Sequence, residues 1–196
     1  MSKTVAYDKI KTTNWVDGND TQVKQLKFLL LGAYVFLYVG SAILIMLGHT
    51  GFTSVSLSVI IVPFLIGMVT LLISIKQTNA KKVMASIVLI PPVICLFLLS
   101  INQYNSIFTT NKWVKNKDKR VYLVDHLLEK YELEGMAKDD VNALLGNPTT
   151  TEYFKEDENY VYYLGPERGP IRIDSEWLVI SFNEKDIVER YEVKTD

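Results

Sequence analysis

The stretch Phe28–Gly48 reads FLLLGAYVFLYVGSAILIMLG, 21 residues without a charged side chain. Two further uncharged apolar runs follow it, Phe52–Ile75 with 24 residues and Val83–Ile101 with 19. A helix needs about 20 residues to cross the hydrocarbon core of a bilayer, and each run comes close to or exceeds that length. A helix that is apolar on every side belongs in a membrane or in a large protein core. The sequence therefore predicts a three-helix transmembrane region over residues 28–101.

Short polar segments, His49–Gly51 and Lys76–Lys82, connect the three runs, so we expect an up-down-up bundle with a solvated His49. No Asp, Glu, Lys or Arg lies inside any run. Ion pumps and transporters of charged substrates usually need such a residue, so the bundle is interpreted as an anchor. Cys95, the single cysteine, lies inside the third run and is expected to be buried; one cysteine excludes an intramolecular disulfide.

The distribution of lysine predicts the orientation of the bundle. Residues 1–27 contain five lysines and residues 76–82 contain three, whereas the first connection contains none. Because cytoplasmic loops are enriched in Lys and Arg, we expect residues 1–27 to be a cytoplasmic tail, mostly loop. Three crossings then place the chain from residue 102 onward outside the membrane. The expected localisation is the cytoplasmic membrane, with several spans and the N-terminus inside.

The charge balance changes sign along the chain. Residues 1–109 carry a net charge of +5 and residues 110–196 a net charge of −6, which together give −1. This asymmetry, with the apolar residues gathered in the first half, excludes a single soluble globule. A nucleic-acid-binding protein would need a basic face, so the partners expected are the lipid bilayer and another protein, not nucleic acid.

Residues 102–117 are polar and are expected to form a linker or a helix extension, followed by a domain over 118–196. Apolar residues at helical spacing predict one helix over Val121–Tyr131 and a second from about Ala137, which ends at Gly146 before Pro148. Alternating patterns then predict four strands: Thr150–Lys155, Tyr160–Leu164, Ile171–Phe182 and Ile187–Val193. The expected fold is a small α+β domain, with two helices on one face of an antiparallel meander. The expected core contains Val124, Leu127, Leu128, Val141, Leu144, Leu145, Leu178, Ile180 and Phe182.

Strand alternation predicts which side chains the uncovered sheet face presents. If Phe154 and Leu178 face the helices, then Tyr153 and Trp177 face away, and Tyr162 is expected to join them. Exposed aromatic residues and arginine are typical anchors of protein interfaces, so Tyr153, Tyr162 and Trp177, with Arg168 in the loop 165–170, are the candidate protein-binding residues. An alternative remains open, in which Trp177 closes a second small core against a loop or the linker.

No group of residues indicates catalysis, a cofactor or a metal. Asp139 and Asp140 suit the first turn of a helix, where acidic side chains complement the helix dipole. His126 lies on the first predicted helix and is expected to be solvated. A metal site would need more His or Cys ligands than two histidines and one cysteine provide.

The segment Leu133–Pro148 resembles the signature of the SmpA/OmlA, or BamE-like, envelope proteins. The resemblance rests on Gly-Met, a charged pair, Val, and Leu-Gly-x-Pro, and extends over about residues 120–193. Two features differ: Ala137 stands where the family has a capping Thr or Ser, and three apolar helices replace a lipidated cysteine. The residues that carry the signature are Gly135, Met136, Val141, Leu145, Gly146 and Pro148.

The resemblance implies a bacterial, non-catalytic protein that presents an interaction domain outside the membrane. Within this class, an envelope assembly accessory and an immunity-type protein that protects the cell from a toxin both remain open. The alternative class is a regulatory or structural subunit of a membrane transporter or channel.

Overall fold

A computed structural model of the chain describes the backbone of residues 2–74, 78–169 and 171–196. Side chains are described for residue 22 and from residue 25 onward, except for 73–81 and 170. The chain divides into two compact units, which are described in turn. One unit contains Met1–Ala42 and Ser58–Cys95, and the other contains Ile43–Leu57 and Leu96–Asp196.

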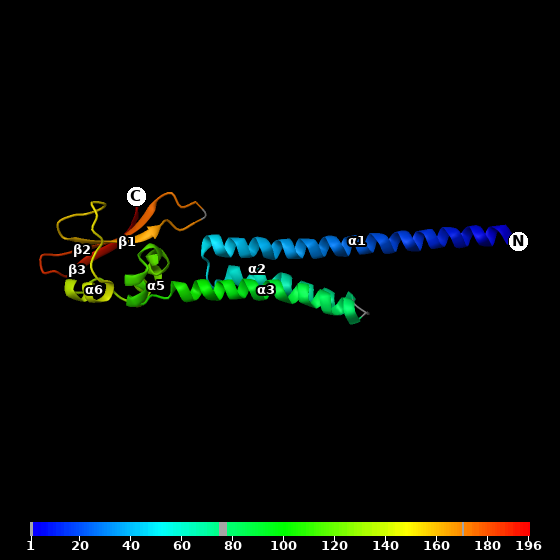
Figure 1. The fold of residues 1–196 in the computed structure, drawn as a ribbon, viewed down its shortest axis with the longest axis horizontal. Helices are drawn as coiled ribbons and strands as arrows, with labels where there is room; N and C mark the ends of the chain where they lie inside the picture. The colour runs from blue at the N-terminus through cyan, green and yellow to red at the C-terminus, as the bar shows by residue number, and fades with distance from the viewer. Residues whose placement is uncertain (1, 75–77, 170) are drawn as a thin grey trace. The chain divides into compact units, whose positions relative to one another are not determined.

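Three long helices contain the apolar runs (Figure 1). These are α1 (Ser2–Gly48), α2 (Ser54–Ser74) and α3 (Thr78–Ser106). Each includes a segment long and apolar enough to cross a membrane, namely Gln25–Gly48, Ser54–Leu72 and Lys82–Ser106. The prediction of three such helices is confirmed in length and composition.

The N-terminal segment is helical, so the prediction of a loop over residues 1–27 was wrong for the described residues. α1 begins at Ser2 and runs without a break into the first apolar run. Residues 2–27 contain no proline, and extending an existing helix costs far less than nucleating a new one. Four lysines of this segment, Lys3, Lys9, Lys11 and Lys24, and most of the connection 76–82 lie outside the residues whose side chains are described.

Polar groups between the apolar helices of the first unit are satisfied by backbone carbonyls. The Tyr38 hydroxyl donates to the Ile60 carbonyl at 2.5 Å, and the Tyr34 hydroxyl donates to the Val88 carbonyl at 2.8 Å. The Cys95 thiol lies 3.7 Å from the Tyr38 carbonyl and is buried, as the sequence predicted. In an apolar environment such groups are costly unless they find a hydrogen-bond partner.

The second unit contains four short helices followed by a sheet. The helices are α4 (Thr110–Lys115), the 3-10 helix η1 (Lys117–Tyr122), α5 (Val124–Lys130) and α6 (Lys138–Leu145). The single helix expected over 121–131 is therefore two elements. The second predicted helix is confirmed, and it ends at Gly146, where φ is +73°.

The sheet has three antiparallel strands in chain order, β1 (Asn159–Pro166), β2 (Ser175–Phe182) and β3 (Val188–Thr195). The helices pack on one of its faces, and the core between them is continuous. Residues 107–115, expected to form a linker, contribute Phe108 and Trp113 to this core. Of the nine residues predicted for the core, seven are fully buried, whereas Leu128 and Leu144 are partly buried against it.

The strand predicted over Thr150–Lys155 does not form. The Thr151 hydroxyl accepts the backbone N–H of Tyr153, and the Asn159 amide donates to the Phe154 carbonyl at 2.7 Å. Phe154 itself has φ of +53°. Local side-chain hydrogen bonds thus replace the ladder that a strand would need.

The third predicted strand is shorter than expected, because residues 171–174 belong to the β1–β2 loop. The backbone N–H of Glu167 donates to the Asp174 carbonyl at 2.9 Å, and this bond closes the loop before β2 begins at Ser175.

Candidate functional site

The sheet face opposite the helices carries a second, smaller core. Val161, Trp177 and Val179 are buried there. Phe154 from the preceding loop and Tyr163 from β1 pack against them, partly buried. The prediction that Phe154 faces the helices was therefore wrong. Trp177 points away from the helices as expected, but it closes a second core, which was the alternative reading of the sequence.

Among the described residues, Tyr153 is the most exposed aromatic side chain on this face. It is 56% exposed, whereas Trp177 beneath it is 6% exposed. The two rings stack at a centroid distance of 5.3 Å and an interplanar angle of 24°. The indole N–H of Trp177 is buried without a hydrogen-bond partner. The stack therefore presents the ring of Tyr153 to solvent, and the buried ring of Trp177 supports it.

Tyr162 lies on the opposite side of the sheet, so its predicted place on the uncovered face was wrong. The residue is fully buried in the main core. Its hydroxyl donates to the Gly146 carbonyl at 2.9 Å, and burial raises the pKa of this phenol. Tyr162 therefore joins β1 to the end of α6 and cannot serve as a surface anchor.

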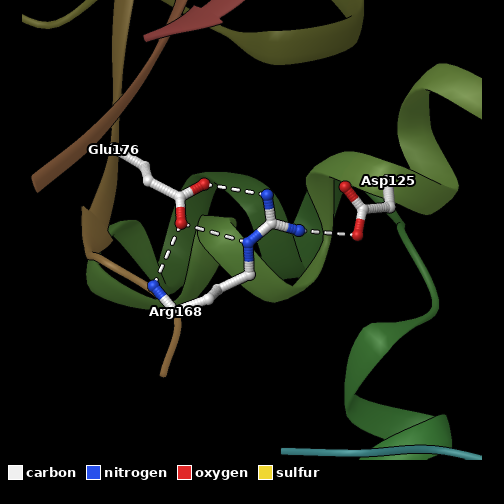
Figure 2. A network of polar contacts seen from close by, with 3 residues as sticks. All are labelled: Asp125, Arg168 and Glu176. Carbon is white, nitrogen blue, oxygen red and sulfur yellow. Dashed lines mark hydrogen bonds and ion pairs between the residues drawn. The ribbon is translucent and has the colours of Figure 1, made fainter. Parts of the chain in front are cut away.

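Arg168 is held by two carboxylates (Figure 2). Its backbone N–H and Nε donate to Oε1 of Glu176 at 3.0 and 3.1 Å, and Nη2 donates to Oε2 at 2.9 Å. Nη1 donates to Oδ2 of Asp125 at 2.6 Å. Partial burial alone would lower the pKa of Arg168, but the two carboxylates raise it above its ordinary value. These bonds from Arg168 hold the β1–β2 loop against β2 and α5, so the main role of Arg168 is structural.

The signature residues bring α6 against the start of β3. The backbone N–H of Gly135 donates to the Val188 carbonyl, and the N–H of Val188 donates to the Met136 carbonyl, both at 2.9 Å. Val141 and Leu145 are fully buried in the main core. Gly146 adopts a positive φ, and Pro148 follows it half-buried. The described part of the signature is a packing motif.

A basic pocket of about 450 Å³ lies elsewhere in the second unit, and the sequence did not indicate it. His49 lines it, with its ring stacked on Tyr122 at 3.7 Å between centroids. His49 is half-buried and its Nε2 is buried without a partner, so the expectation of a solvated histidine was wrong. The remaining lining residues are Asn105, Lys112, Asn116, Asp118, Lys119, Leu123, Pro166 and Arg172.

His126 is not freely solvated, contrary to expectation, since it is half-buried and its Nδ1 accepts the backbone N–H of Phe108 at 3.3 Å. Within the described ranges, no group of three or more His, Cys, Asp or Glu side chains is placed to hold a metal ion.

Residues 122–192 match the family model described as outer membrane protein assembly factor BamE domain. No curated protein and no solved structure matches the chain. The matched segment begins inside η1 and ends within β3, so it contains both α5 and α6 and nearly the whole sheet. The C-terminal part of this chain therefore matches the BamE domain model, and three apolar helices precede the matched segment.

Proposed function

We propose that the chain is a non-catalytic integral membrane protein that presents its BamE domain to a protein partner outside the cytoplasmic membrane of a bacterium. The surface of the helical unit supports the anchor. Large apolar side chains point outward from α1, including Phe28, Leu29 and Phe36, which are 75%, 71% and 80% exposed. Contiguous apolar surface of this kind is rare on soluble proteins, whereas a bilayer accommodates it.

The orientation rests on the lysines described above. With the N-terminus and the segment 76–82 in the cytoplasm, three crossings put the BamE domain on the outer side. Single cysteines at positions 79 and 157, each in a chain with Cys95→Ala, test this arrangement. In intact cells, an impermeant thiol reagent should label position 157 and leave position 79 unlabelled until the membrane is broken. The reverse pattern would place the BamE domain in the cytoplasm.

The stack of Tyr153 on Trp177 is the observation that carries the proposed protein contact. Rigid aromatic side chains contribute large contact area at little cost in conformational entropy, and Tyr153 is half-exposed over a buried support. Arg168, which keeps 40% of its side chain exposed, borders the same sheet. The family description names an assembly factor, which also supports a role in protein association.

A photo-crosslinking amino acid at position 153 tests this contact in living cells. We expect crosslinks to one discrete envelope or secreted protein from position 153. Position 191 is the matched control, because Tyr191 lies on β3 and packs against the main core on the other face. Equal crosslinking from both positions would contradict the proposed surface. An assembly-machine component as the crosslinked protein would assign an accessory role, and a toxin would assign an immunity role.

A further inference from the structure

The β1–β2 loop carries two large apolar side chains in open solvent. Ile171 is 70% exposed and Ile173 is 82% exposed. These are the largest exposures of large apolar side chains among the described residues from 107 to 196. Removing apolar side chains from water is favourable, so burial of these two isoleucines in an apolar environment would stabilise the protein.

Arg172, between these isoleucines, locates the loop relative to the ends of the apolar helices. It lines the basic pocket together with His49 and Asn105. His49 directly follows the last residue of α1, and Asn105 lies in the last turn of α3. These two positions mark the point at which the apolar segments Gln25–Gly48 and Lys82–Ser106 end. The loop therefore lies at the level where a membrane-spanning helix would meet the lipid headgroups.

The charges around the pocket complement that environment. Lys112, Lys119 and Arg172 line it, against one carboxylate, Asp118. The Lys112 ammonium donates to the backbone carbonyls of Tyr104 and Ile107. Basic side chains near a membrane surface are attracted to it when the lipids are anionic. The phosphate groups of phospholipids are thus the partner whose chemistry matches both the cations and the neighbouring apolar side chains.

We propose that the β1–β2 loop enters the outer interfacial layer of the bilayer, with Ile171 and Ile173 at the acyl boundary and Lys119 and Arg172 beside headgroup phosphates. This inference rests on the proposed membrane anchoring. Interfacial segments bury their apolar side chains about 5–10 Å into the boundary between headgroups and acyl chains. The contact holds the BamE domain close to the membrane surface.

Depth-dependent fluorescence quenching tests the loop in the full chain. An environment-sensitive probe is attached to Ile173→Cys in a Cys95→Ala background, and the protein is reconstituted into vesicles of phosphatidylcholine with one third phosphatidylglycerol. We expect a blue-shifted spectrum and a loss of fluorescence with lipids that carry a nitroxide near the headgroup. A probe at Glu184→Cys, in the β2–β3 turn, is the aqueous control and should not be quenched. Weaker quenching at position 173 in pure phosphatidylcholine vesicles supports the contribution of the basic pocket.

A probe at Ile61→Cys, in the middle of α2, separates failure of the loop from failure of the anchor. Quenching at position 61 by lipids labelled deep in the acyl chain, with none at 173, overturns the inference and leaves the anchor standing. No quenching at either position overturns both. A blue shift at 173 without quenching means that protein covers the loop, and this also overturns the inference. Equal quenching at 173 in both vesicles overturns the contribution of anionic headgroup charge.

Discussion

Ala137 occupies the N-cap of α6 with extended backbone (φ −70°, ψ 148°) and has no side chain able to cap the helix. A backbone carbonyl partly replaces the missing hydroxyl, since Lys138 N–H donates to the Asp186 carbonyl at 2.9 Å. We expect Ala137→Ser to raise the free energy of unfolding by about 1 kcal/mol, because a serine oxygen at this position accepts a further helix N–H. Thermal unfolding of the parent, Ala137→Ser and Ala137→Gly proteins measures this increase in the free energy of unfolding. A serine variant no more stable than the parent would mean that the cap is already complete.

His49 provides a second prediction at the scale of one residue. Burial first, and then the charges of Arg172 and Lys119, lower the pKa of His49 below its ordinary value. The folded protein then binds fewer protons at His49 than the unfolded chain does. The contribution of this residue to stability is therefore present at neutral pH and decreases as the pH falls through about 6.5, the unfolded-state pKa, towards the lowered value.

An NMR titration of the two histidines in detergent free of anionic lipid measures this pKa directly. We expect the His49 resonance to titrate below pH 6.5, and Arg172→Gln to move the midpoint upward because one neighbouring positive charge is lost. Lys130→Gln is the control, since Lys130 is not among the causes of the shift. A midpoint unchanged by Arg172→Gln would contradict the electrostatic account.

At the scale of elements, the end of β1 depends on close contact with η1. Gly165 has φ of +128°, and a Cβ there would overlap the backbone carbonyl of Asp118, with its carbon only 2.9 Å away. Gly169, in the loop that follows β1, has φ of +134° and nothing within 4 Å of the position of a Cβ. The two glycines thus share a positive φ and differ in their surroundings.

We expect Gly165→Ala to destabilise the domain by about 1–3 kcal/mol more than Gly169→Ala, because only the first substitution adds overpacking to the strain of a positive φ. Chemical denaturation of the two variants gives the comparison. Equal losses would show that β1 and η1 can move apart without cost.

How well the sequence predicted these elements depends on how far apart in the sequence the contacting residues lie. The apolar runs, α6 and its glycine cap follow from local patterns, and all were predicted. Tyr162 and Tyr163 are adjacent aromatics on opposite faces of β1, so alternation could not decide which one faces the helices; a shift of one residue exchanges the faces. Phe154 could not be placed because its loop is shaped by the Asn159 side chain and by packing on Trp177. The basic pocket joins residues from 49 to 172, a separation that no local pattern reveals.

At the scale of the whole molecule, the main core includes residues that precede the domain predicted over 118–196. Phe108 and Trp113 are at most 1% exposed and lie in the main core, although they precede residue 118. We expect a fragment of residues 107–196 to unfold cooperatively, and a fragment of residues 118–196 to lose about 3–5 kcal/mol for each missing aromatic side chain. Denaturant unfolding monitored by far-ultraviolet circular dichroism compares the two. Equal stability of both fragments would show that residues 107–117 only cover the surface.

The strand order of the sheet, β1-β2-β3, has a consequence for folding kinetics. Hairpins β1–β2 and β2–β3 close short loops, so they can form early at a small entropic cost. The contact of α6 with the turn before β3 is different, because Lys138 and Asp186 are 48 residues apart. We therefore expect the sheet to form first and α6 to pack against it late. Weakening the Lys138–Asp186 contact should then increase the unfolding rate and leave the folding rate nearly unchanged.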